Sequence, residues 1–174
     1  MKKPGWRSKL ADRLRIIPDV ERVRSPNQLP PCWNIAKYLY KSESRKNPNY
    51  HAHFMYATLL HLEHQVTDTT TPGTLVEVQD EYEVSIGMNP NFAEAHLCLG
   101  NVYWHQARFL VNQDRESAPA QERLMTLIEK SRRVLEKARR LNPSLRERVE
   151  GELSELRELE TSIHPTGLPP ARLK

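Results

Sequence analysis

Residues 89–103 read NPNFAEAHLCLGNVY, and they repeat the pattern of residues 47–60, which read NPNYHAHFMYATLL. The two Asn-Pro pairs lie 42 positions apart, whereas the apolar segments that follow them align at an offset of 43, so one residue is inserted between them. A third Asn-Pro pair stands at residues 142–143. Self-similarity at a near-constant spacing is typical of stacked arrays of one structural unit. We therefore expect a repeat protein.

The Asn-Pro pairs predict the corners of an all-α fold. Each pair stands between two amphipathic segments, and a proline disfavours the helical conformation of the residue before it, so one helix ends there and the next begins. Prolines also crowd both ends of the chain. We expect a basic, proline-rich arm with a short amphipathic helix at 1–32, helical repeats at 33–143, a capping helix at 144–163 and a flexible tail at 164–174.

The repeated residues resemble the tetratricopeptide repeat (TPR) family, whose units pair a first helix with a second. The likeness covers roughly residues 33–143 as an irregular, short array. The first helices carry the family's positions at His53, Tyr56, Ala57 and Leu60, and again at His96, Leu99, Gly100 and Tyr103. The second helices carry them at Ala36, Tyr40, Glu43 and Pro48, at Val78, Tyr82, Ser85 and Pro90, and at Ser131, Leu135, Ala138 and Pro143. The resemblance implies an α-solenoid of antiparallel helix hairpins, in which the small residues Ala57 and Gly100 let paired helices approach closely.

Two features depart from the family pattern. Long polar loops are predicted at residues 66–74 and 110–119, where the family has short turns, and loops of this length can carry contacts. Glu43 and Ser85 stand where a small apolar residue is usual, so we expect looser packing there.

Residues 144–163 predict a helix that closes the array. Ser144 and Glu147 have the spacing of a capping box, and apolar residues recur at helical spacing through this segment, with Glu and Arg between them. A polar outer face on such a helix keeps the last apolar face of a solenoid out of water.

The resemblance implies a concave groove, lined by the first helices, that binds a peptide or a helix of a partner. Carried over by position, the groove residues are His51, Phe54, Thr58, His61 and Leu62 from the first unit, and Glu94, Leu97, Asn101, Trp104 and His105 from the second. Trp104 is the expected anchor, because a partly exposed indole offers a large contact area and one hydrogen-bond donor. Packing of Trp104 against the next hairpin is an equal alternative.

Histidine is concentrated in the same region, with six of seven between residues 51 and 105. His61 and His64 lie one helical turn apart, a spacing compatible with zinc. However, His53 and His96 occupy interhelix packing positions, so we interpret the histidines as core residues and expect no metal site. Only 6 glycines are present among 174 residues, which leaves little material for phosphate-binding loops. We expect no cofactor, no small-molecule substrate and no catalytic activity.

The charge is unevenly distributed. Residues 1–24 carry eight bases and three acids, a net charge of +5, whereas the whole chain carries +4, so the rest is close to neutral. Nucleic-acid-binding folds usually have a basic face on the folded part, which argues against such a partner. On a helical wheel one apolar stripe is flanked by basic residues; the residues of this arm are Trp6, Arg7, Lys9, Leu10, Arg13, Leu14, Arg15 and Ile17.

Three roles for the arm stay open, namely packing against the array, docking to a partner and binding to a membrane surface. The sequence as a whole predicts a cytoplasmic adaptor or structural subunit of a larger complex, which binds partner proteins through the groove and the basic arm. The alternative is a peripheral membrane-associated assembly factor that is anchored by the arm.

Overall fold

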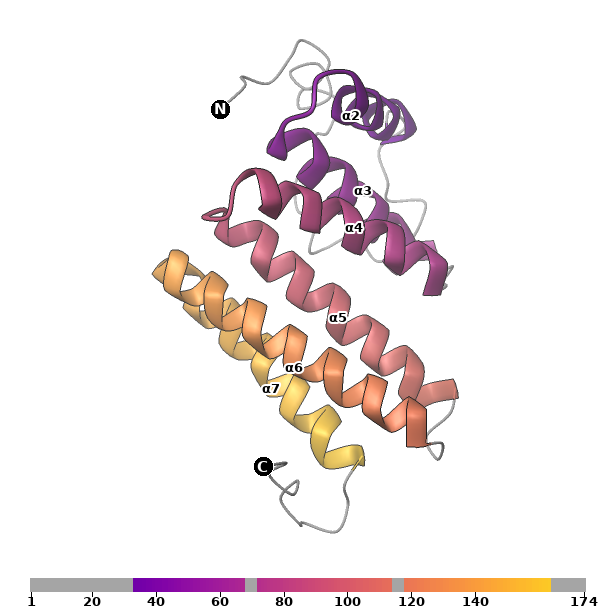
Figure 1. The fold of residues 1–174 in the computed structure, drawn as a ribbon, viewed down its shortest axis with the longest axis vertical. Helices are drawn as coiled ribbons and strands as arrows, with labels where there is room; N and C mark the ends of the chain where they lie inside the picture. The colour runs from indigo at the N-terminus through magenta and orange to yellow at the C-terminus, as the bar shows by residue number, and fades with distance from the viewer. Residues whose placement is uncertain (1–32, 68–71, 114–117, 164–174) are drawn as a thin grey trace.

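The computed structural model describes residues 33–67, 72–113 and 118–163, and these ranges are helical throughout except at short corners (Figure 1). The helices are α2 (Trp33–Lys46), α3 (Tyr50–Thr67), α4 (Pro72–Met88), α5 (Ala93–Gln113), α6 (Ala118–Leu141) and α7 (Arg146–Ile163), with a 3-10 turn η3 (Pro143–Leu145) before α7. None of the described residues forms a strand. The predicted all-α fold class is confirmed.

The helices are stacked in chain order. Each helix packs against the next one along the chain, and α7 packs against both α6 and α5. Figure 1 shows the stack along the long axis of the molecule, from α2 at one end to α7 at the other, with successive helices running in opposite directions. The Asn-Pro corners lie together at one edge of the stack, and the ends of α3 and α5 lie at the opposite edge.

Asparagine side chains bond to the backbone at the first and the third of the three corners. Asn49 is 5% exposed, and its Oδ1 accepts a hydrogen bond of 2.9 Å from the backbone N–H of Ala52 in the first turn of α3. Oδ1 of Asn142 accepts from the backbone N–H of Ser144 at 3.1 Å. The predicted capping box at Ser144 is therefore wrong, because Asn142 caps η3 and Ser144 lies inside that turn. A side-chain acceptor supplies a partner to an N–H that the helix start leaves unpaired.

The two long polar loops predicted at residues 66–74 and 110–119 are wrong in their extent, because helices occupy most of the described residues in these ranges. Helix α3 continues to Thr67 and α4 begins at Pro72, while α5 continues to Gln113 and α6 begins at Ala118. Proline is tolerated in the first turn of a helix, because the N–H that it lacks would have no intrahelical partner there. The polar residues at these helix ends therefore belong to the helices and not to a loop.

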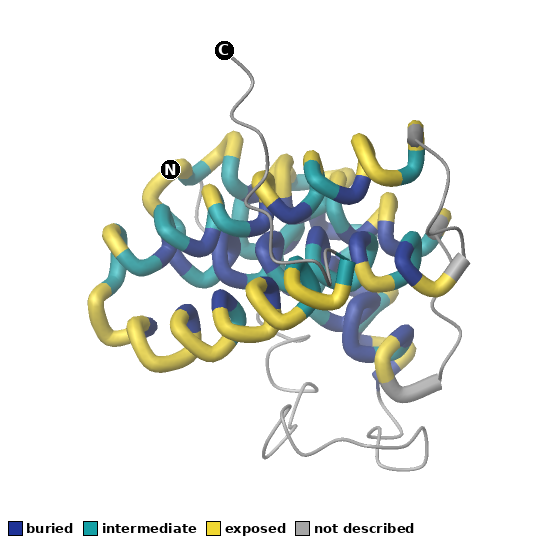
Figure 2. The backbone as a smooth tube through the Cα atoms, turned by 90° about the horizontal axis from the view of Figure 1, so that it is seen from below, coloured by how far each residue is buried: buried dark blue, intermediate teal, exposed yellow. Residues whose placement is uncertain are grey.

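The core repeats with the corners. When α2, α4 and α6 are aligned on their Asn-Pro pairs, the same positions are buried to 1% exposure or less in all three helices. These positions are Ala36, Val78 and Ser131, then Tyr40, Tyr82 and Leu135, then Glu43, Ser85 and Ala138. Figure 2 shows buried residues along the inner side of each helix and exposed residues along the outer side.

The polar residues in this core are hydrogen-bonded, so the expected loosening at Glu43 and Ser85 does not occur. Oε1 of Glu43 accepts from Nδ2 of Asn47 at 3.0 Å. Oγ of Ser85 donates to the backbone carbonyl of Tyr50 at 2.9 Å, and so ties α4 to the start of α3. A buried polar group with a partner avoids the desolvation cost of an unpaired one.

Candidate protein-interaction site

The five groove residues predicted on α3 lie mostly in helix contacts. Phe54 is half-buried, and its ring centroid lies 4.7 Å from that of Phe92 and 5.8 Å from that of Tyr82. Oγ1 of Thr58 accepts from the hydroxyl of Tyr82 at 3.2 Å. The remaining three pack in a similar way: His51 lies edge-on to Tyr40, and His61 and Leu62 are buried.

Helix α7 covers part of the predicted groove on α5. Nδ2 of Asn101 donates to both carboxylate oxygens of Glu152 on α7, at 3.1 and 2.9 Å. Leu97 is 3% exposed and belongs to the core cluster that α7 shares. Burial raises the pKa of Glu152, against the effect of the Asn101 hydrogen bond. Glu94 is half-buried at the start of α5.

Trp104, the expected anchor, is half-buried between α5 and α7. Its Nε1 is buried and has no acceptor among the described residues. The guanidinium of Arg108 lies 5.3 Å from the ring centroid, and the ring of His105 lies edge-on at 4.7 Å. Trp104 also lines an open cleft of about 500 Å³, together with Arg108, Val111, Asn112, Glu155, Glu158, Leu159 and Ser162. Trp104 therefore both packs against the neighbouring core and remains partly exposed.

Two of the histidines meet across α3 and α5. The ring centroids of His61 and His105 are 5.4 Å apart with the planes nearly perpendicular, and Nε2 of Gln65 lies 3.3 Å from Nε2 of His61 and 3.1 Å from Nε2 of His105. Burial lowers the pKa of His61 to about 3 and that of His105 to about 4. Both rings are therefore neutral at pH 7. Within the described ranges, no three His, Cys, Asp or Glu side chains are grouped so as to hold a metal ion.

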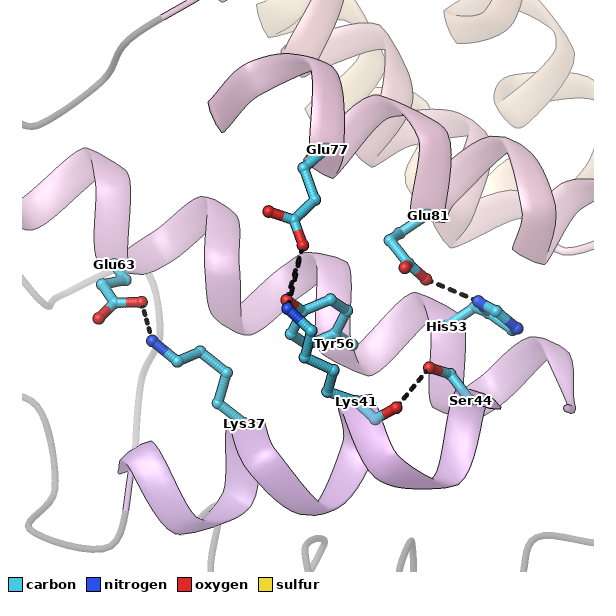
Figure 3. A network of polar contacts seen from close by, with 8 residues as sticks. All are labelled: Lys37, Lys41, Ser44, His53, Tyr56, Glu63, Glu77 and Glu81. Carbon is cyan, nitrogen blue, oxygen red and sulfur yellow. Dashed lines mark hydrogen bonds and ion pairs between the residues drawn. The ribbon is translucent and has the colours of Figure 1, made fainter. Parts of the chain in front are cut away.

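A set of polar contacts joins α2, α3 and α4 (Figure 3). Lys37 of α2 pairs with Glu63 of α3, and Nδ1 of His53 lies 2.6 Å from Oε2 of Glu81 on α4. Oε1 of Glu77 on α4 accepts from the hydroxyl of Tyr56 at 2.9 Å and from Nζ of Lys41 at 3.3 Å. These charged groups serve contacts between helices.

A second open cleft in the described part of the chain lies elsewhere, between α4, α5 and α6. A cleft of about 660 Å³ is lined by Leu75, Val76 and Gln79 of α4, by Gln106, Phe109 and Leu110 of α5, and by Glu122, Arg123, Thr126, Leu127 and Lys130 of α6. Five of these eleven side chains are large and apolar. Nε2 of Gln106 donates to Oε1 of Gln79 at 3.0 Å, which joins α5 to α4 beside the cleft.

The sequence analysis did not find this cleft. Its walls come mainly from the second helices, whereas the resemblance directs attention to the first. The available signal was Val76, one of the large apolar residues of α4 that are strongly exposed, at 49%.

The predicted arm residues Trp6 to Ile17, and the predicted tail at 164–174, lie outside the described residues. Of the helices in the described ranges, none combines the length and the apolar character needed to cross a membrane.

No protein-family model, curated protein sequence or solved structure matches this chain.

Proposed function

We propose that this chain is a non-catalytic protein-interaction module, an adaptor or structural subunit of a larger complex, built as a TPR-like solenoid of helix hairpins. The shared buried positions of α2, α4 and α6 support the repeat, because three helices with the same packing positions can stack on the same kind of neighbour. The chain-order packing of the helices supports it as well.

The observation that carries the proposal is the cleft between α4, α5 and α6. Its volume of about 660 Å³ lies in the range of binding pockets. Its apolar lining residues Phe109, Leu110 and Leu127 are half-buried, whereas its charged lining residues Glu122 and Arg123 are exposed. An apolar centre inside a polar rim is how protein interfaces are built.

A protein segment with a large apolar side chain is the occupant that fits this cleft best. The cleft is open to solvent along α4, where Val76 is 49% exposed. A partner helix laid beside α4 in the cleft would bury Val76 together with the other lining residues. The amide pair of Gln79 and Gln106 offers uncharged hydrogen-bonding groups to its backbone or polar side chains.

Thr126→Arg tests this proposal in the full-length chain. Thr126 is exposed and lines the cleft, and its hydroxyl bonds only to the Glu122 carbonyl of its own helix, so an arginine there fills the cleft without disturbing the core. Thr161→Arg on α7 is the matched control, since Thr161 is exposed and has the same kind of bond to Glu158. Tagged chains are expressed in native cells, and co-purifying proteins are quantified by mass spectrometry.

We expect at least one protein that co-purifies equally with the unmodified chain and with Thr161→Arg, and that falls about tenfold with Thr126→Arg, the equivalent of about 1.4 kcal/mol. Binding of that protein to the purified chain, and its loss with Thr126→Arg, completes the test. Equal recovery of every bound protein with both variants would reject the cleft as the docking site.

A further inference from the structure

The two most exposed large apolar side chains in the described ranges lie on α2. Ile35 is 55% exposed and Tyr38 is 69% exposed. They are one helical turn apart, on the side of α2 opposite to the buried residues Trp33, Ala36 and Tyr40. This pair forms an apolar patch at the end of the stack, beyond which no described helix packs.

The aligned positions of the other second helices are charged. Counted from the Asn-Pro corners, Ile35 corresponds to Glu77 of α4 and Lys130 of α6, and Tyr38 corresponds to Asp80 and Arg133. All four charged residues are exposed, as are Ile35 and Tyr38. The same outward positions therefore face water as charges in two helices and carry large apolar groups only in the first.

The opposite end of the stack is polar. Helix α7 buries Val149, Leu153 and Leu156 and exposes charged residues such as Glu150 and Arg157, and among the described residues of α7 no large apolar side chain is strongly exposed. A stack of helices needs a polar surface at each end. The apolar patch of α2 indicates that a further segment covers this end.

We infer that the segment Trp6–Ile17 of this same chain packs on Ile35 and Tyr38. The chain outside the described structure at this end is 32 residues long and ends directly at Trp33, the first residue of α2. It contains one apolar stripe at helical spacing, formed by Trp6, Leu10, Leu14 and Ile17. The apolar stripe of the segment and the apolar patch of α2 can therefore bury each other.

The connecting residues are long enough for this contact. Residues 18–32 span up to about 50 Å when extended, whereas the 14 residues of α2 make a helix about 21 Å long. The segment can thus lie along α2 in either direction. Lys37 and Lys41 of α2 pair with Glu63 and Glu77, so their charges are directed to α3 and α4.

A second copy of the chain is a poorer occupant. Stable protein interfaces bury about 800 Å² on each partner, and two side chains on one helix supply a fraction of that area. A tethered segment needs no such area, since its effective concentration is high. In this arrangement the arm uses its apolar stripe inside the molecule and leaves Lys9 and Arg13 at the surface. The inference does not depend on the proposed partner binding.

Hydrogen–deuterium exchange of the full-length chain tests this contact. In the unmodified chain, the amides of residues 6–17 should exchange at least about tenfold more slowly than in a free peptide of residues 1–24. The test variant is Ile35→Glu with Tyr38→Asp, which gives α2 the acidic residues that α4 has at the aligned positions. The control is Val84→Glu with Met88→Asp, which changes the exposed apolar residues of α4 instead.

The test variant should return residues 6–17 to the exchange rates of the free peptide, whereas the control should leave their protection intact. The same exchange spectra show whether α2 itself remains folded in the test variant. A second variant, Leu10→Asp with Leu14→Asp, changes no residue of the array and should also remove the protection of residues 6–17. The inference is overturned if residues 6–17 are unprotected in the unmodified chain, if the test variant keeps the protection, if the α4 control loses it, or if the protection depends on protein concentration. None of these readouts requires a partner, so they are independent of the co-purification experiment.

Discussion

Leu135 of α6 lies directly against the backbone of Gly100 of α5. A Cβ built on Gly100 would stand 2.6 Å from Cγ and 2.7 Å from Cδ2 of Leu135, closer than carbon atoms pack in proteins. Leu135 is fully buried, so it cannot turn out into solvent to make room. The sequence-based expectation that Gly100 allows a close helix approach agrees with this contact.

Gly100→Ala should therefore destabilise the protein. Alanine favours a helix over glycine by about 1 kcal/mol, but forcing a methyl group into a packed core costs about 1–3 kcal/mol and can cost more at this separation. We expect a net loss of about 1–2 kcal/mol in the free energy of unfolding, measured by chemical denaturation.

Gly151→Ala on α7 is the matched control. No atom lies within 4 Å of a Cβ built on Gly151, so only the helix preference acts there. We expect it to raise the free energy of unfolding by up to about 1 kcal/mol. If both alanine variants gain stability, the close approach of α5 and α6 at Gly100 is wrong.

Ser131→Ala should weaken the same contact between helices. Oγ of Ser131 is buried and donates to the backbone carbonyl of Gly100 at 2.7 Å. Loss of a buried hydrogen bond costs about 1 kcal/mol, and Ser154→Ala on the exposed side of α7 should change the unfolding free energy by less than half of that. Equal effects of the two substitutions in urea denaturation would contradict the bond.

Asn101→Ala should leave the half-buried carboxylate of Glu152 without its amide donor. We expect a loss of about 1–2 kcal/mol at pH 7, because a desolvated charge without a partner is costly. Burial already raises the pKa of Glu152, so the penalty should shrink as the pH falls and the carboxylate binds a proton. Adding Glu152→Leu should recover most of the loss, and a failure to recover would show that Asn101 acts through another contact.

His61 and His105 predict a loss of stability in mild acid. Their pKa values in the folded protein are about 3 and about 4, below the 6.5 of an exposed histidine. Above pH 6.5 both rings are neutral in the folded and in the unfolded chain. Below pH 6.5 the rings of the unfolded chain bind protons that those of the folded chain do not, so the free energy of unfolding decreases as the pH is lowered.

His105→Gln should flatten this pH dependence. Between pH 6.5 and 5 the variant should lose about 1–2 kcal/mol less than the unmodified protein. Urea denaturation at a series of pH values measures the difference, and pH 7.5 serves as the reference at which neither ring is charged. Parallel curves for the two proteins would contradict the burial of this pair.

The corners were predictable because they depend on local chemistry. Helix α2 ends at Lys46, α4 at Met88 and α6 at Leu141, each directly before an Asn-Pro pair. The other helix ends were not predictable in this way, since Pro72 can begin a helix as well as break one. The preference of one residue does not distinguish the two outcomes when the neighbouring helices supply the packing energy.

The candidate site depends on contacts between helices, which the spacing of apolar residues along the sequence does not specify. A helical wheel places Asn101 and Leu97 on one face of α5, but whether that face meets water or α7 is decided by the path of the chain after residue 142. The cleft at Phe109 and Leu127 is likewise made by three helices together. Its signal in the sequence was limited to apolar residues such as Val76, whose exposure only the packing of the helices reveals.

The amino-acid sequence alone determined that residues 33–163 are helical, apart from the corners, wherever the structure describes them, where the asparagine-proline corners lie, and which positions, such as Tyr40, Tyr82 and Leu135, are buried. These properties follow from backbone restriction and apolar spacing within single segments. Only the tertiary structure decided which surfaces remain open, because the exposure of a side chain depends on the helices that pack beside it, and those helices come from distant parts of the chain.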